Sequence, residues 1–90
     1  MALMRTLTIT NVKGLHARAS ARFVETVEEF DASATVRRDG QTVAGDSIMG
    51  LLLLAAAKGT TIDVTTSGPQ ADALMEALEA LVADRFGEEK

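Results

Sequence analysis

The chain has 90 residues, of which 47% are hydrophobic and 24% are charged. This length suits one small domain and is too short for two separate cores, so we expect a single domain over residues 1–90. Nine basic and thirteen acidic residues give a net charge of -4, which argues against non-specific nucleic-acid binding because such binding needs a basic surface. With no cysteine and one histidine, the chain also excludes disulfide frameworks and metal sites built from several histidines or thiolates.

The chain carries no signal for a membrane or for export. Its first residues lack the basic-then-apolar layout of a signal peptide. The longest uninterrupted apolar run covers only residues 51–57, far short of the ~20 residues that span a bilayer. We therefore expect a soluble, intracellular protein without membrane insertion.

Hydrophobic periodicity predicts the element order β-α-β-β-α-β-α. The strands are expected at residues 6–10, 32–37, 41–44 and 60–66, and the helices at residues 17–29, 48–57 and 70–85. Asp39-Gly40 joins the second and third strands, a dipeptide that favours a two-residue hairpin turn. Residues 87–90 are expected to fray. Four strands with helices on one face predict a two-layer α+β domain whose other face meets solvent.

A histidine stands at the start of the first predicted helix. His16 follows Gly14-Leu15, and Arg18 lies two positions further on. The first turn of a helix offers unpaired N–H groups and the positive end of the dipole, which attract anions, and a guanidinium matches phosphate oxygens. A neutral imidazole at this place is a nucleophile whose covalent product would be a phosphohistidine. The alternative, a ring that only caps the helix, stays open at this point.

The second predicted helix is apolar on more sides than one sheet can cover. Leu51 and Leu54 cannot point inward together with every other large apolar residue of the helix. The four residues left outside form an expected apolar patch, namely Ile48, Met49, Leu52 and Leu53. An exposed apolar patch usually marks a partner surface; the alternative is a helix enclosed on most sides.

Ser47 precedes this helix and is a good N-cap, although Asp46 could take that role instead. A phosphate on Ser47 would be tolerated by the helix dipole, and it would place a dianion at the edge of the apolar patch. Such a modification would spare the fold while repelling a partner.

The run Gly14-Leu15-His16-Ala17-Arg18, followed some thirty residues later by Ser47-Ile48-Met49-Gly50, resembles the HPr family of phosphocarriers. Residues 53–60 also resemble the family's second helix and the turn that follows it. The resemblance implies an open-faced β-sandwich, in which three helices cover one face of a four-stranded antiparallel sheet. It also implies a cytoplasmic protein of the phosphoenolpyruvate-dependent phosphotransferase system, acted on by other enzymes and not itself an independent enzyme.

The resemblance implies a role for individual residues as well. Enzyme I would phosphorylate His16 on Nδ1, and His16 would pass the phosphoryl group to an enzyme IIA domain. Arg18 and the backbone N–H groups of Ala17 and Arg18 would hold the phosphoryl oxygens. Partners would dock on Ala17 and the apolar patch. Ser47 matches a regulatory serine that an HPr kinase/phosphorylase modifies in many members. No cofactor is implied, and a compact carrier that meets several partners is expected to be a monomer.

One departure from the family pattern is Ala19, where most members carry proline directly after the arginine; proline there presets a helical φ. Ala19 and the Ser-Ile-Met-Gly run lean toward the nitrogen-related branch, NPr, or a regulatory variant. Sugar uptake and nitrogen or metabolic regulation therefore both stay open. The alternative function is a non-catalytic regulatory module of the same fold, acting through Ser47 phosphorylation and the apolar surface of residues 48–53.

Overall fold

The computed structural model describes residues 2–89, and its elements follow the predicted order. The strands are β1 (Leu3–Thr8), β2 (Ser33–Arg38), β3 (Gln41–Ala44) and β4 (Thr61–Ser67), and the helices are α1 (Ala17–Glu28), α2 (Ile48–Leu53) and α3 (Ala71–Ala83), followed by the single turn η1 (Arg85–Gly87).

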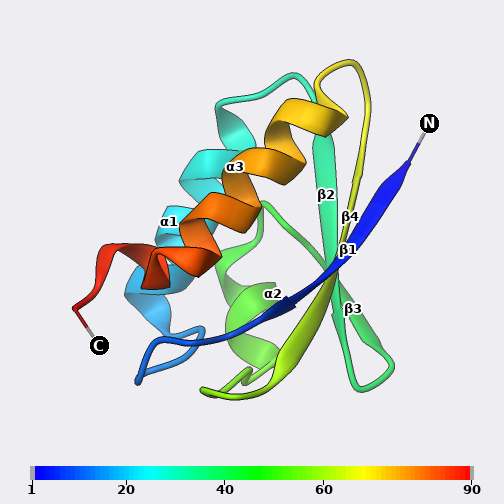
Figure 1. Cartoon of the computed structure of the whole chain (residues 1–90). Helices are drawn as coiled ribbons and strands as arrows, with labels where there is room; N and C mark the ends of the chain where they lie inside the picture. The colour runs from blue at the N-terminus through cyan, green and yellow to red at the C-terminus, as the bar shows by residue number, and fades with distance from the viewer. Residues whose placement is uncertain (1, 90) are drawn as a thin grey trace.

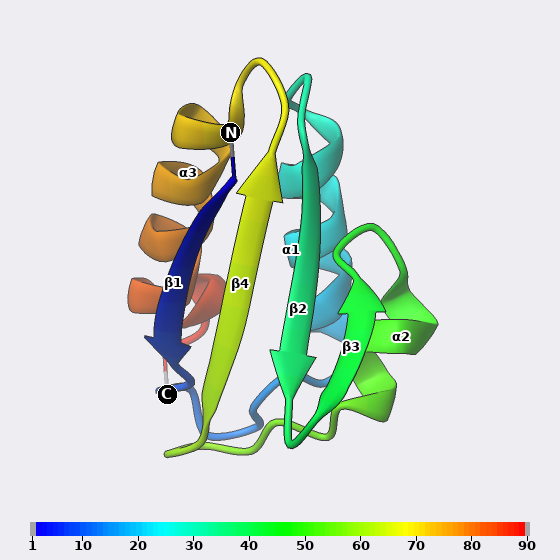
Figure 2. The same cartoon turned by 90° about the vertical axis from the view of Figure 1, so that its right-hand side faces the viewer.

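The strands form one antiparallel sheet in the order β1-β4-β2-β3 (Figure 2). The helices cover one face of this sheet and leave the other face open, with α1 and α3 running along it and α2 next to β3 (Figure 1). The expected open-faced β-sandwich of the α+β class is therefore confirmed.

The core lies between the sheet and the helices because alternate strand residues point to the same face. Ile62 and Val64 of β4 are buried on that face, while Asp63 between them is more exposed. Phe23 of α1 and Leu74 and Leu78 of α3 are fully buried against them. The amphipathic faces predicted for the first and third helices are thus the faces that pack on the sheet.

The turn between β2 and β3 adopts the two-residue hairpin conformation that the sequence predicts. Both central residues adopt positive φ, 52° at Asp39 and 78° at Gly40, as a two-residue turn that matches strand twist requires. Arg38 and Gln41 close the hairpin as paired residues.

The first strand was expected at residues 6–10, but β1 begins at Leu3 and ends at Thr8. Its first residues pair with the end of β4, starting with Leu3 opposite Thr66. Ile9 lies beyond the strand and is fully buried, with its N–H donating to the Thr60 carbonyl over 2.9 Å. The prediction missed residues 3–5 because β1 is an edge strand, whose residues Met4 and Arg5 are both exposed and show no alternation.

The second helix was expected to reach residue 57, and this is wrong: α2 ends at Leu53. Ala55 adopts a positive φ of 50°, which no right-handed helix contains. The break turns the chain so that Ala56 becomes buried and its carbonyl oxygen accepts the N–H of Leu15 over 2.9 Å. This tertiary contact overrides the high helix propensity of the three alanines that follow α2.

Candidate functional site

His16 is the N-cap of α1, as the sequence predicts for a residue at the helix start. Its backbone is extended, with φ -80° and ψ -175°, and its carbonyl oxygen accepts the N–H of Ser20 over 2.8 Å. Its side chain makes no capping hydrogen bond. The N–H groups of Ala17, Arg18 and Ala19 therefore begin the helix without intrahelical partners. The imidazole is 26% exposed, so the ring is reachable from solvent and is not packed in the core.

The loop before α1 is fixed by contacts on both sides. Gly14 has φ 66°, and a Cβ built on it would lie 2.4 Å from the carbonyl oxygen of Ala56. Only glycine fits this close approach. Leu15 is buried, and the fully buried Asn11 donates from Nδ2 to the Gly14 carbonyl over 2.8 Å. The backbone that delivers His16 is thus set by the segment that follows α2 and by Asn11 within the same loop.

Basic side chains gather in the segments on both sides of the histidine along the chain. Lys13, Arg18 and Arg22 line a surface cleft of about 410 Å³ together with Val12 and the C-terminal residues 86–89. Arg18 is exposed and forms no ion pair with any residue in the described part of the chain. The free N–H groups, the helix dipole and these cations make the region around His16 suited to a phosphoryl dianion.

Glu88 is a site residue that the sequence reading missed. Its Oε2 lies 2.5 Å from His16 Nε2, and its Oε1 accepts Nδ2 of Asn11 over 2.9 Å. Burial by itself raises the pKa of this carboxyl, but the hydrogen bonds from Asn11 and His16, together with the positive charges of His16 (when protonated) and Lys13, outweigh it. The net pKa lies below the ordinary value of 4.5. Glu88 is therefore ionised at neutral pH and acts as an acceptor.

The expected fraying of residues 87–90 stays a prediction about motion, and Lys90 lies outside the described residues. The structure nevertheless gives this tail defined contacts. The sequence held one signal for them, because Phe86 continues the apolar period of the third helix and is fully buried.

Ser47 caps α2, and Asp46 does not: Ser47 Oγ accepts the N–H of Gly50 over 3.0 Å. Leu51 and Leu54 are buried, as the sequence reading assumed for the inner side of this helix. The apolar patch lies on the outer side, with Met49 69% and Leu53 65% exposed.

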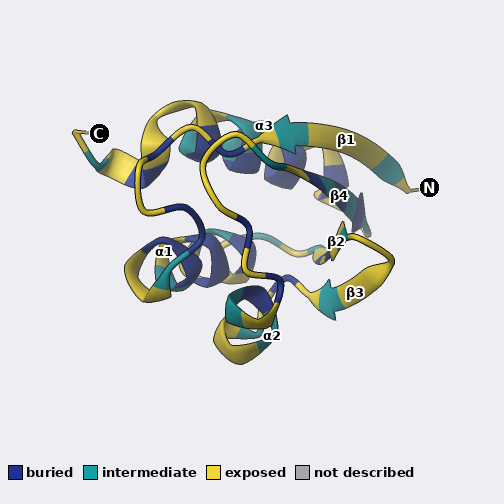
Figure 3. Cartoon of the chain, turned by 90° about the horizontal axis from the view of Figure 1, so that it is seen from below, coloured by how far each residue is buried: buried dark blue, intermediate teal, exposed yellow. Residues whose placement is uncertain are grey.

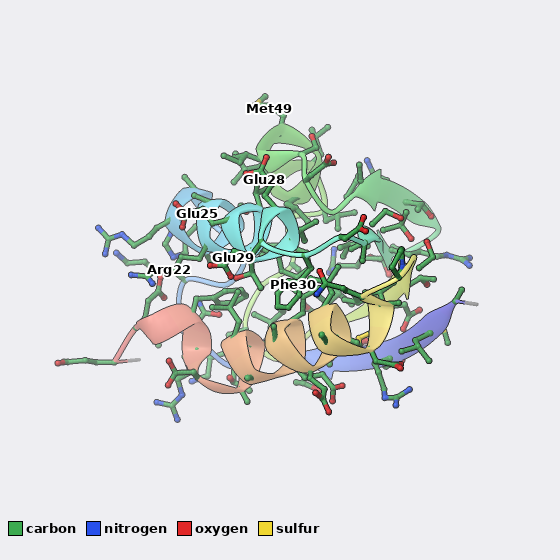
Figure 4. The ribbon with its side chains drawn as sticks, turned by 90° about the horizontal axis from the view of Figure 1, so that it is seen from above. Arg22, Glu25, Glu28, Glu29, Phe30 and Met49 are labelled. Atoms are coloured by element: carbon green, nitrogen blue, oxygen red, sulfur yellow. The ribbon has the colours of Figure 1, made fainter. Side chains whose placement is uncertain are left out.

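The helix that carries the apolar patch, α2, lies next to α1. The two helices are in contact, and α2 turns its exposed side away from the core (Figure 3). Met49 projects from the outer side of α2, and Glu25, Glu28 and Glu29 lie along α1 (Figure 4). These glutamates are exposed, in keeping with a solvated helix face. The apolar patch and the start of α1 thus belong to neighbouring elements.

Ala19 is fully buried at the third position of α1. Within residues 2–89, no group of three acidic or histidine side chains is placed to hold a metal ion. None of the helices in the described part of the chain has the length and apolar character needed to cross a bilayer.

A family model described as "PTS HPr component phosphorylation site" matches residues 3–84. The chain belongs to the HPr family of phosphocarrier proteins. It is 45% identical over 86 residues to the phosphocarrier protein HPr of Cupriavidus necator, covering 96% of this chain and 97% of that protein. It is 38% identical over 90 residues to the phosphocarrier protein NPr of Escherichia coli, covering 99% and 100% of the two chains.

Solved HPr structures share the fold. The crystal structure of HPr-C-His from Thermoanaerobacter tengcongensis superposes with a TM-score of 0.93 at 34% identity, covering 98% of this chain and 99% of the other. The expected family and fold are therefore confirmed. As an HPr-family member, the protein is a phosphocarrier of the phosphotransferase system and not a catalyst in its own right.

Proposed function

We propose that this protein accepts a phosphoryl group from phospho-enzyme I on Nδ1 of His16 and passes it to an enzyme IIA domain. The observation that carries the proposal is the placement of His16, which is solvent-accessible, at the start of α1 and beside unpaired N–H groups. Family membership supplies the reaction class, and the residues around the ring supply the means to perform it.

The transfer is a displacement at phosphorus. The lone pair of Nδ1 attacks the phosphorus atom of the donor phosphohistidine, the donor P–N bond breaks, and its electron pair returns to the donor ring. The N–H groups of Ala17 and Arg18 and the Arg18 guanidinium stabilise the negative charge on the three phosphoryl oxygens. Positioning and charge neutralisation are the main requirements of this chemistry, so few functional groups are needed. The second transfer, to enzyme IIA, runs the same steps with this protein as donor.

Partners dock on Ala17 and the apolar patch in this proposal. Ala17 is exposed at the start of α1, next to the ring. Ile48, Met49 and Leu53 are the exposed large hydrophobic residues of α2, and Leu52 is half-buried between them. Both enzyme I and enzyme IIA must bring a reacting group to His16, so a shared apolar surface beside it serves both encounters.

Ser47 is the proposed regulatory phosphorylation site, with an HPr kinase/phosphorylase as the modifying partner. Its hydroxyl caps α2 directly before the apolar patch. A phosphate on this oxygen would add negative charge at the edge of the docking surface and weaken partner binding. The same observation supports the alternative function, a regulatory module that works through Ser47 and the surface of residues 48–53 alone.

We further propose that the protein is cytoplasmic and monomeric and forms one domain over residues 1–90, with no cofactor. A related structure from Thermoanaerobacter tengcongensis is described as an HPr dimer. Sedimentation tests the oligomeric state, and the proposal expects a monomer. Whether the carrier serves sugar uptake or nitrogen regulation is decided by which enzyme IIA domains it loads.

The test is incorporation of labelled phosphate from phosphoenolpyruvate with purified enzyme I. The wild type and Ser47→Ala are expected to take up phosphate, and His16→Ala is expected to take up none. Uptake by His16→Ala equal to that of the wild type would refute the proposal. Partner capture that depends on Ser47 phosphorylation but ignores His16 substitution would favour the regulatory module instead.

A further inference from the structure

The contact between His16 and Glu88 joins the start of α1 to the end of the chain. Glu88 Oε2 lies 2.5 Å from Nε2 of His16. An ionised carboxylate has no hydrogen to give, so the ring nitrogen must donate. The proton of the neutral imidazole therefore lies on Nε2. No hydrogen bond engages Nδ1 among the described residues, which leaves the lone pair of this nitrogen for the incoming phosphorus.

The carboxylate is itself held in place. Oε1 accepts Nδ2 of Asn11 over 2.9 Å, and the same amide donates to the Gly14 carbonyl over 2.8 Å. Asn11 is fully buried, so this amide is a fixed support. One side chain thus ties the loop that delivers His16 to the acid that orients its ring, an arrangement that fixes orientation better than an isolated pair.

The backbone before Glu88 adopts an uncommon conformation to reach this place. Arg85 and Phe86 both have φ 56°, and Gly87 has φ 78°. Positive φ at two consecutive residues other than glycine is unfavourable and persists only where the surroundings enforce it. The fully buried Phe86 anchors this turn, and the Arg22 guanidinium packs over Gly87. The turn bends the chain after α3 back toward α1 (Figure 1).

The hydrogen bond between His16 and Glu88 affects the charge of the ring during phosphoryl transfer. When Nδ1 bonds to phosphorus while Nε2 keeps its proton, the ring acquires a positive charge. A carboxylate hydrogen-bonded to Nε2–H stabilises that charge as it develops, in the way that an acid orients and stabilises a histidine in a catalytic triad. The cleft that contains Glu88 is also lined by the cations Lys13, Arg18 and Arg22 and by Glu89. Glu88 is the one anionic side chain in hydrogen-bond contact with the ring in the described part of the chain.

We infer that Glu88 is a positioning residue for phosphoryl transfer: it holds the proton on Nε2 of His16, presents Nδ1 to the donor and balances the charge of the phosphorylated ring. This inference rests on the proposed function and deepens it. It also gives a role to the left-handed turn of residues 85–87, which delivers the acid.

The test compares three variants of the full chain. Glu88→Ala removes the acceptor, Glu88→Gln removes only its charge, and Glu76→Gln is the matched control because it makes the same charge change at an exposed position of α3, outside the cleft. Two quantities are measured: the nitrogen NMR signals of the His16 ring at alkaline pH, and the rate of phosphate uptake from phospho-enzyme I. Circular dichroism verifies that each variant is folded.

Glu88→Ala is expected to shift the ring signals from the Nε2–H form toward a mixture of the two tautomers. Both Glu88 variants are expected to take up phosphate about tenfold more slowly, while Glu76→Gln matches the wild type. Uptake by Glu88→Ala at the rate of Glu76→Gln would overturn the inference, whatever the ring signals show, and would leave the proposed function intact. Absence of uptake by the wild type would instead overturn the proposed function.

Discussion

Leu15 donates its backbone N–H to the carbonyl oxygen of Ala56 over 2.9 Å. Through this hydrogen bond, the loop that carries His16 packs directly against the segment that follows α2. The two elements that form the proposed docking surface are therefore connected through the backbone. Gly14, the residue before Leu15, makes this approach possible.

Replacing Gly14 by alanine is expected to destabilise the fold by at least about 2 kcal/mol. The added methyl would meet the Ala56 carbonyl at 2.4 Å, and the residue would have to keep a φ of 66°. Gly40→Ala is the matched control, because Gly40 has φ 78° but nothing within 4 Å of its Cβ position; its expected cost is about 1 kcal/mol. Urea unfolding of both variants measures the difference. Equal costs would show that the close approach does not matter.

Replacing Ser47 by alanine is expected to cost about 1 kcal/mol in unfolding free energy, because the N–H of Gly50 loses its capping oxygen. Ser33→Ala serves as control: its hydroxyl bonds only to Ser67 on the exposed face of the sheet, and its expected cost is below about 0.5 kcal/mol. Neither change is expected to alter phosphate uptake. A Ser47→Ala variant as stable as the wild type would contradict the capping role.

Introducing lysine at Met49 is expected to raise the KM for phospho-enzyme I about tenfold, because a charge replaces part of the apolar patch. Stability should change by less than about 0.5 kcal/mol, since Met49 is 69% exposed. Met4→Lys is the matched control, a methionine 59% exposed on β1, at the opposite edge of the sheet from α2. Uptake kinetics that respond equally to the two changes would argue against docking at α2.

Glu88 is expected to make stability depend on pH in acid. Its pKa is lower in the folded protein than its ordinary value of 4.5, so its ionised form favours folding. That contribution is fully present above about pH 4.5 and is lost as the pH falls through the folded pKa. The stability difference between wild type and Glu88→Gln should therefore shrink in acid. A difference that grows as the pH falls, measured by urea unfolding, would contradict the sign of this shift.

Local patterns predicted much of this fold. Asp39-Gly40 alone predicted the hairpin, because the two positive φ values it needs are a property of those residues. The apolar face of α1 and the capping by Ser47 were likewise readable, since both depend on neighbours within a few positions along the chain. The helix start at His16 was predictable for the same reason, whereas the roles of His16 and Arg18 came from the resemblance to the HPr family and stay predictions.

The parts that were not predictable depend on contacts between distant segments. The end of α2 is set by the hydrogen bond between Leu15 and Ala56, and nothing in the alanine run itself signals a break at Ala55. Glu88 reaches His16 across 72 residues of chain, through a turn in which Arg85 and Phe86 adopt a backbone conformation that their residue types disfavour. Glycine and acidic residues at the end of a chain are typical of a frayed tail, so the sequence alone does not indicate the contacts of Glu88.

The most direct test of the phosphocarrier account is the position of the phosphate itself. The protein is labelled with nitrogen-15, phosphorylated with phosphoenolpyruvate and enzyme I, and examined by NMR for coupling between phosphorus and the ring nitrogens of His16. The account predicts one phosphorus atom per chain, coupled to Nδ1, with the proton retained on Nε2. Phosphorus coupled to Nε2, or found on a residue other than His16, would contradict it.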